Sequence, residues 1–274
     1  MKYSYLIVGA GFTGAVIARE IADKLNEPTL IIDRRNHISG NAFDHYDKSG
    51  VLVHEYGPHI FHTNSHQVWE FLSKFTEWNP YEHRVIGKIG KEHIPIPFNF
   101  SSIETMFSSK EANIIKSQLL EEHGNEVKVP ILNLMKSKNR FVKELADYVY
   151  TNIFFNYTKK MWDLEPQELD PAVLSRVPIQ IGYDDRYFHD KYQSMPKNGY
   201  TKMFQKILDH PNIEVKLKTH FKDISNPEEF KKIIYTGPID EYFDYRHGEL
   251  PYRSIRFEFT TENKEYAQKV ATIN

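Results

Sequence analysis

Three glycines near the start of the chain have the spacing that phosphate binding requires. Gly9, Gly11 and Gly14 form a G-x-G-x-x-G pattern directly after the apolar residues 5–8. In that order, glycines allow a tight turn, a close approach of the backbone to a pyrophosphate, and close packing of the helix that follows. The pyrophosphate would then lie on free N–H groups at the positive end of the helix dipole. We therefore expect a dinucleotide-binding site here.

The elements that must position these glycines occur around them in the right order. Residues 5–8 predict a strand, a helix is predicted as far as Leu25, and residues 29–32 predict a second buried strand that ends at Asp33. An acidic residue about 20 positions beyond the last glycine can accept hydrogen bonds from a ribose diol. The pattern predicts a β-α-β dinucleotide-binding unit but does not discriminate between NAD and FAD.

Composition excludes several kinds of chemistry. The chain has 274 residues, a formal charge of −2 from 35 basic and 37 acidic side chains, and no cysteine. The balanced charge argues against nucleic acid and anionic membranes as partners. The lack of cysteine excludes disulfides, thiolate nucleophiles and cysteine-ligated metals. Without a signal peptide or an apolar run close to the roughly 20 residues of a membrane span, we expect a cytoplasmic protein.

The spacing of apolar residues predicts three parts. Residues 1–100 hold the β-α-β unit and then short strands and loops, whereas residues 101–165 have apolar residues three and four apart, which is typical of an inserted helical domain. Residues 166–274 return to mixed structure, with a helix predicted at 200–208 and strands at 213–217, 232–236 and 254–260. A strand that ends at Gly237-Pro238 would bring the chain back beside the nucleotide.

A group of histidines could suggest a metal site. His54, His59, His62 and His66 lie close together in the sequence, but no acidic residue separates His59 from His62 as a metalloprotease motif would require. We expect no metal. The imidazoles are either hydrogen-bonded to the backbone or lie against a cofactor ring whose protonation they could tune.

A second constellation mixes aromatic and basic side chains. Residues 155–162, Arg176 and residues 183–188 supply two arginines and several aromatic rings. Rings can stack on a base and guanidinium groups can bind diphosphate oxygens, so these residues could hold a nucleotide diphosphate. The alternative is a core position for Trp162 and a surface ion pair for Arg176.

Short segments spread over nearly the whole chain resemble those of one family. In order they are GAGFTGAVIARE, IIDRRNHISGNAFD, YGPHIFHTN, NYTKKMW, YDDRYF, MPKNGYTKMF, YTGPIDEYF and GELPYRSIRFE. Together they resemble UDP-galactopyranose mutase. The resemblance implies an α/β fold in which a Rossmann-like FAD-binding domain carries the inserted helical domain and an additional sheet layer.

The same resemblance implies an activity. Members interconvert UDP-galactopyranose and UDP-galactofuranose, a precursor of surface polysaccharides, with no net redox change. The N5 atom of reduced FAD forms an adduct with the sugar, and NADPH or NADH supplies the reducing equivalents. Relatives are typically homodimers, so a homodimer is expected.

The resemblance also assigns roles to residues of this sequence. His62 and Arg176 are expected to be catalytic, with Arg176 on a mobile loop that closes over the substrate. FAD would be held by Gly9, Gly11, Phe12, Thr13, Gly14, Asp33, Arg34, Asn41, His59, Ile60 and Phe221. The UDP-sugar would be held by His83, Tyr157, Thr158, Trp162, Arg176, Tyr187, Phe188 and Asn274.

One departure from the family leaves other functions open. The resemblance implies roughly a hundred further residues after Asn274, which would carry a second diphosphate-binding arginine and a segment that closes over the flavin. The C-terminal completion of the fold is thus expected to be missing. An amine-oxidase-like FAD oxidoreductase and a truncated, non-catalytic nucleotide-binding remnant are the alternatives.

Overall fold

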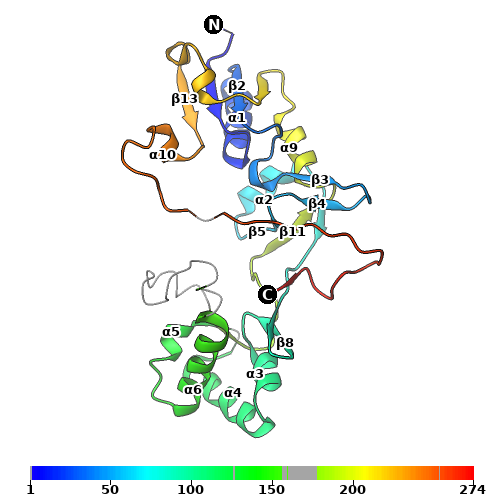
Figure 1. Ribbon diagram of the computed structural model, residues 1–274, viewed down its shortest axis with the longest axis vertical. Helices are drawn as coiled ribbons and strands as arrows, with labels where there is room; N and C mark the ends of the chain where they lie inside the picture. The colour runs from blue at the N-terminus through cyan, green and yellow to red at the C-terminus, as the bar shows by residue number, and fades with distance from the viewer. Residues whose placement is uncertain (1, 126, 156–158, 160–177, 253) are drawn as a thin grey trace. The chain divides into compact units, whose positions relative to one another are not determined.

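The structure, a computed structural model, describes residues 2–125, 127–155, 159, 178–252 and 254–274. The chain forms two compact units (Figure 1). The first unit comprises Met1–Tyr81 and Asp190–Thr261, and the second comprises Glu82–His189 and Glu262–Asn274.

A four-stranded parallel sheet forms the centre of the first unit. Its strands lie in the order β12–β2–β1–β13. The central strand β1 therefore has β2 on one side and the much later β13 on the other. The strand order reverses between β1 and β13, so the carboxyl ends of these two strands form a topological switch point. The strand bounds are β1 (Tyr5–Val8), β2 (Thr29–Asp33), β12 (Ile213–Leu217) and β13 (Lys232–Tyr235).

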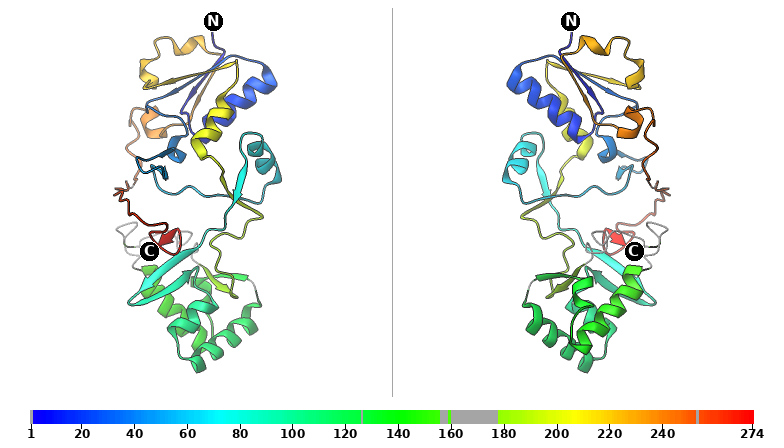
Figure 2. Two further views of the ribbon diagram at one scale, coloured as in Figure 1. Left: turned by 90° about the vertical axis from the view of Figure 1, so that its right-hand side faces the viewer. Right: turned by 90° about the vertical axis from the view of Figure 1, so that its left-hand side faces the viewer.

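Helix α1 (Phe12–Leu25) follows from its local sequence. It is rich in alanine, carries Lys24 in its last turn, and ends at Asn26 in the left-handed conformation that often closes a helix. Together with α9 (Tyr200–Leu208), it covers one face of the sheet (Figure 2). Ile7 and Ile31 point to that face, whereas Leu6 and Leu30 alternate to the other face, against Phe221 and its neighbours.

The remaining elements of the first unit are short. Four stacked aromatic rings, with centroids 4.6–4.9 Å apart, join α2 to the antiparallel sheet β5–β11–β6; they are Phe61, Trp78, Trp69 and Tyr192. The bounds are β3 (Asp44–Tyr46), β4 (Leu52–His54), β5 (Phe61–Thr63), α2 (His66–Ser73), β6 (Trp78–Pro80), β11 (Tyr192–Pro196), α10 (Ile239–Tyr242) and the 3-10 turns Gly40–Ala42, Phe221–Asp223 and Pro227–Glu229.

The second unit is mainly helical and has its own apolar core. Asn99 and Ser108 each close a capping box at the start of a helix, and Asn139 caps a third helix, which explains where these helices begin. The bounds are β7 (Val85–Ile89), β8 (Glu92–Ile96), α3 (Phe100–Met106), α4 (Ser109–His123), β9 (Val127–Pro130), α5 (Ile131–Leu134), α6 (Arg140–Val149), the π-helix Tyr150–Phe155, β10 (Pro178–Ile181) and β14 (Thr272–Ile273).

Most of the predicted elements are confirmed, and one is wrong. The first β-α-β unit, the helix at 200–208 and the strand at 213–217 lie where the sequence predicts them. The predicted strand at 254–260 is not formed, because that segment has no neighbouring strand among the described residues. In the part of the chain that the structure describes, no helix has both the length and the apolar character needed to cross a membrane.

Candidate functional site

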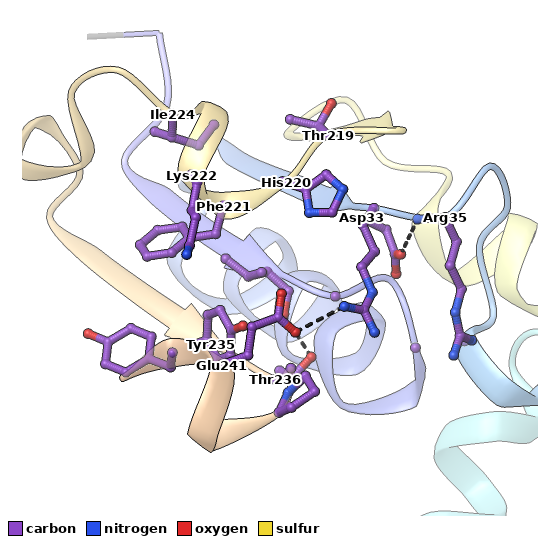
Figure 3. A pocket seen from close by; sticks show the side chains of 18 of the residues that line it. Asp33, Arg35, Thr219, His220, Phe221, Lys222, Ile224, Tyr235, Thr236 and Glu241 are labelled. Atoms are coloured by element: carbon purple, nitrogen blue, oxygen red, sulfur yellow. Dashed lines mark hydrogen bonds and ion pairs between the residues drawn. The ribbon is translucent and has the colours of Figure 1, made fainter. Parts of the chain in front are cut away.

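A pocket of about 710 Å³ opens where β1, β2 and β13 end (Figure 3). Val8 and Gly9 line it from β1, Asp33 from β2, and Tyr235 and Thr236 from β13. The carboxyl ends of parallel strands at a switch point are where α/β sheets bind ligands. The pocket is therefore the first candidate for a nucleotide site.

The three glycines of the fingerprint differ in the contacts that a Cβ would make at each position. Gly9 has φ +109°, and a Cβ there would lie 2.2 Å from Thr236 Oγ1. A Cβ on Gly14 would lie 1.9 Å from the carbonyl oxygen of Gly9. Among the described residues, a Cβ on Gly11 would meet only the Cα of Gly40, at an ordinary 3.7 Å. The fold itself thus explains Gly9 and Gly14, whereas the open space at Gly11 suits a ligand that approaches the backbone closely.

The start of α1 offers hydrogen-bond donors to such a ligand. Gly11 is the N-cap residue and has no side chain with which to bond the first N–H groups of the helix. These groups lie at the positive end of the helix dipole and favour an anion. Gly40 comes close to this point, since its own Cβ would lie 3.0 Å from the Cα of Gly11.

Asp33 is held firmly at the end of β2. Its side chain is nearly buried, Oδ2 accepts a hydrogen bond from the N–H of Ala10 at 2.8 Å, and Oδ1 accepts one from the N–H of Arg35 at 2.9 Å. Each carboxylate oxygen has a second lone pair. The carboxylate is thus oriented by the backbone and can still accept from the hydroxyls of a ribose.

Charged and aromatic side chains form the walls of the pocket. Arg34 Nη1 donates to Glu241 Oε2 at 2.9 Å, which joins the end of β2 to α10. Phe221, Tyr235 and Tyr242 form a ring cluster with centroids 4.9–6.1 Å apart. Figure 3 shows the charged and aromatic groups on the elements around the opening. This wall has flat apolar faces against which a base could lie.

The predicted FAD residues fall into two groups. Those that line the pocket are Gly9, Gly11, Asp33, Arg34, Asn41 and Phe221. Those that are not among its described lining residues are Phe12, Thr13, Gly14, His59 and Ile60. Phe12 instead packs edge-on against Tyr200 and Phe204 in the core.

The histidines of residues 54–66 bond mainly to nearby groups of the first unit. The N–H of His59 donates to Nδ1 of His54 at 3.0 Å, and burial lowers the pKa of His54. His62 Nδ1 lies 2.9 Å from Asp190 Oδ2, and the Asn64 side chain donates to the other oxygen of that carboxylate. His54 and His59 thus have the predicted backbone partners, whereas His62 and His66 bond to the side chains of Asp190 and Tyr192. A role beside a cofactor ring stays a prediction.

Three of the predicted substrate residues lie together in the second unit. His83 packs edge-on against Tyr187 and stacks on Phe188, with ring centroids 5.7 and 6.1 Å apart. The N–H of Tyr187 donates to the carbonyl of His83 at 2.8 Å. His83 is buried, and its burial lowers the pKa of the imidazole. Segments far apart in the sequence thus form one aromatic cluster, in which burial favours the uncharged form of the His83 imidazole.

A network of ion pairs joins the two segments that carry His83 and Tyr187. Arg84 and Arg186 face each other across an antiparallel bridge. Arg186 binds Asp184 through Nε and Nη2, at 3.0 and 2.7 Å, and the pKa of Asp184 falls to about 2 mainly through this hydrogen bonding. Arg84 bonds to both Glu82 and Asp185. The network fixes the backbone on either side of His83 and Tyr187.

Asn274 is also in the second unit, at the end of β14. Its N–H donates to the carbonyl of Ile86, and its carbonyl accepts from the N–H of Lys88, both at 2.8 Å. Thr272 and Ile273 therefore pair with β7 at the edge of its sheet. The predicted residues Tyr157, Thr158, Trp162 and Arg176 lie outside the described residues.

Several residues of the pocket carry no direct signal in the sequence. Gly40, Glu241 and Lys222 line it, but they lie on helical turns of three or four residues, which are too short to show a periodic pattern. The signal for Glu241 was indirect, because the strand that ends at Gly237-Pro238 predicted a return of the chain to this point.

The fold and the pocket define a dinucleotide-binding protein of the Rossmann-like class. Residues 7–75 match the family model of an NAD(P)-binding Rossmann-like domain, and residues 152–274 match the model of UDP-galactopyranose mutase. The chain belongs to the UDP-galactopyranose mutase family, a family of enzymes. The predicted α/β class and the family resemblance are confirmed.

Relatives of known name support this assignment. The chain is 39% identical to a probable UDP-galactopyranose mutase of Klebsiella pneumoniae, over 98% of this chain and 69% of that protein. It is 36% identical to a dTDP-fucopyranose mutase of Escherichia coli, over 95% of this chain and 70% of that protein. The crystal structure of a reduced UDP-galactopyranose mutase matches with a TM-score of 0.61 at 14% identity, over 89% of this chain and 56% of that one. This last likeness shows the fold alone.

Proposed function

We propose that this chain binds FAD in the pocket at the ends of β1, β2 and β13 and interconverts UDP-galactopyranose and UDP-galactofuranose. The observation that carries the proposal is the open space at Gly11: among the described residues, a Cβ added there would make only one contact, at an ordinary distance. Its open space, the donors of α1 and the oriented carboxylate of Asp33 fit a dinucleotide. The family of the chain favours FAD as that dinucleotide.

The described residues would act by binding and orientation. Asp33 would accept hydrogen bonds from the ribose, the first turn of α1 would bind the pyrophosphate, and Phe221 would lie near the adenine. When bound and reduced by NADPH or NADH, FAD would supply a nucleophilic N5 atom for an isomerisation with no net redox change. His83, Tyr187 and Phe188 would bind the nucleotide sugar through ring stacking.

One relative favours a second substrate. The dTDP-fucopyranose mutase is 36% identical to this chain, which lies between the 39% and 33% of two mutases named for UDP-galactopyranose. The ring contraction would be the same for both sugars, whereas the base and the sugar substituents differ. Both nucleotide sugars should therefore be tested side by side.

The experiment has two stages. The purified chain is incubated with FAD, freed of excess cofactor, and its absorbance is recorded near 450 nm, roughly where oxidised flavins absorb. It is then reduced with dithionite, and each nucleotide sugar is followed by chromatography. We expect bound flavin and equilibration of the two ring forms.

The other results point to the alternative functions. Bound flavin that is reduced by a substrate, with net oxidation of that substrate, would favour an amine-oxidase-like oxidoreductase. A folded chain that takes up no flavin would favour a non-catalytic nucleotide-binding remnant.

A further inference from the structure

Three easily oxidised rings stack in series in the first unit. Trp78 of β6 stacks on Trp69 of α2, with ring centroids 4.9 Å apart and planes 21° apart. Trp69 in turn stacks on Tyr192 of β11, at 4.9 Å and 13°. Figure 1 shows α2 beside the strands β5 and β11. Tryptophan, tyrosine and cysteine are the side chains that lose one electron most readily, and the chain has no cysteine.

The last ring of the stack has a proton acceptor. Tyr192 Oη lies 2.9 Å from Nδ1 of His66, and Nε2 of the same imidazole lies 3.1 Å from Oε1 of Glu70. An ionised carboxylate only accepts, so in the neutral imidazole Nε2 carries the N–H and Nδ1 has the lone pair. The hydroxyl of Tyr192 therefore donates to Nδ1. A tyrosine bonded to a base in this way can give up its proton as it gives up an electron.

The charges near Tyr192 favour the loss of that proton. Lys191 Nζ lies 5.2 Å from the centroid of the Tyr192 ring. A ring that lost an electron and kept its proton would carry a positive charge close to this ammonium group, which is unfavourable. Transfer of the proton to His66 leaves a neutral tyrosyl radical and an imidazolium that is paired with Glu70. Tyr192, His66 and Glu70 are thus arranged for the joint loss of an electron and a proton.

We propose that Trp78, Trp69 and Tyr192 conduct an oxidising equivalent along the stack and convert it into a tyrosyl radical at Tyr192. A peroxyl radical takes an electron from Trp78 and, with a proton from water, becomes a hydroperoxide. Trp69 then gives an electron to Trp78, and Tyr192 gives one to Trp69. In the last step the phenolic proton moves to Nδ1 of His66. A reductant in solution, such as ascorbate, returns an electron to the tyrosyl radical, which regains its proton from His66.

This activity goes beyond the proposed function, because it needs no bound flavin and no nucleotide sugar. It would protect the two tryptophans of the stack, since an indole radical that persists is converted irreversibly into oxidised products. The direction follows from the chemistry of the rings. A tyrosine whose proton has an acceptor is oxidised more easily than an indole, so the radical moves toward Tyr192.

A second tyrosine of the chain provides an internal comparison. The Tyr56 hydroxyl lies 2.8 Å from Nε2 of His37, whose Nδ1 lies 2.8 Å from the carbonyl oxygen of Ile38. Tyr56 therefore has an imidazole partner of the same kind as Tyr192. In the part of the chain that the structure describes, however, no tryptophan stacks on Tyr56. The two tyrosines differ in their connection to the indoles.

Pulse radiolysis of the chain without cofactor measures the transfer. Azide radicals oxidise tryptophan faster than tyrosine, and Trp162→Phe in every sample leaves Trp69 and Trp78 as the only indoles. We expect the absorbance of the indolyl radical to decay while that of the tyrosyl radical grows, at a rate independent of protein concentration. Tyr192→Phe keeps a ring in the stack but should abolish this phase. His66→Gln removes the base and should slow the phase about tenfold or more.

A matched control and a second measurement complete the test. Tyr56→Phe should leave the rate of the phase unchanged, and circular dichroism checks that each variant is folded. The same comparison is made in chains that retain Trp162. Mass spectrometry after exposure to peroxyl radicals and ascorbate is the second measurement. Without Tyr192 the radical stays on the indoles, so Tyr192→Phe should increase the oxidised fraction of Trp69 and Trp78 several-fold.

Three results would overturn the proposal. The first is an indolyl radical that decays with no growth of tyrosyl absorbance. The second is a Tyr192→Phe variant that is folded and shows the phase at the rate of the reference chain. The third is a Tyr56→Phe variant that slows the phase as much as Tyr192→Phe does.

Discussion

Arg34 and Glu241 form an ion pair, 2.9 Å long, that joins the end of β2 to α10 at the candidate dinucleotide pocket. The Glu241 side chain is 24% exposed, so the pair is partly shielded from water. Residues from the two ends of the sequence are thereby tied together at a site that neither end forms alone.

Loss of this pair should loosen the pocket. We expect Glu241→Gln to raise the dissociation constant for FAD about three- to fivefold, because partly shielded pairs contribute less than about 1 kcal/mol. Asp244→Asn is the matched control, since its pair with Lys222 also lines the pocket but is about 70% exposed on both sides. Equal effects of the two variants, measured by flavin fluorescence titration, would contradict a special role for Glu241.

Substitutions of two fingerprint glycines should separate binding from folding. Gly14→Ala brings a Cβ to within 1.9 Å of the Gly9 carbonyl, so we expect a loss of several kcal/mol or failure to fold. Gly11→Ala meets no such obstacle and should melt close to the wild-type temperature. It should nevertheless lose most of its flavin, because the methyl group occupies the space left for the pyrophosphate. Melting curves and absorbance spectra of both variants provide the measurement, and retention of flavin by Gly11→Ala would contradict the proposed site.

Two histidines should have pKa values on opposite sides of the ordinary value of 6.5. Burial lowers the pKa of His83, so its stabilising contribution is present above pH 6.5 and is lost as the pH falls through the lowered value. The hydrogen bond to Glu55 raises the pKa of His45, so its contribution is present below pH 6.5 and is lost as the pH rises through the raised value. NMR titration of the imidazole signals tests both. Identical midpoints would show that neither environment acts as described.

Acid should weaken the ion-pair network of Arg84 and Arg186 that flanks His83 and Tyr187. The pKa of Asp184 is lowered from 3.8 to about 2, chiefly by its hydrogen bonds with Arg186. Its contribution is complete above pH 3.8 and disappears as the pH falls toward 2. We expect Asp184→Asn to lower the free energy of unfolding by about 2 kcal/mol at neutral pH and to flatten the pH dependence between these values.

Denaturant titrations at several pH values measure this effect. Asp185→Asn is the control, because its pair with Arg84 is nearly half exposed and should contribute less. An equal loss in both variants would argue that the lower exposure of Asp184, 18% of its side chain, has no consequence.

Much of the nucleotide-binding unit could be predicted because its signals are local. The apolar runs that become β1 and β2, the alanine-rich α1 and the glycines between them follow from residue type and spacing. The same holds for α9. The strand predicted at 254–260 fails for the complementary reason: its pattern is local, but a strand also needs a neighbour, which a pattern cannot supply.

The family, the dinucleotide fingerprint and the position of Asp33 can be predicted from residue order, since each depends on residues close together along the chain. The contacts of Glu241 with Arg34, of Gly40 with Gly11, and of His83 with Tyr187 and Phe188 become visible in the folded chain alone. Such contacts depend on where strands and loops distant in sequence return in space, and the burial of apolar surface by the whole unit fixes those positions.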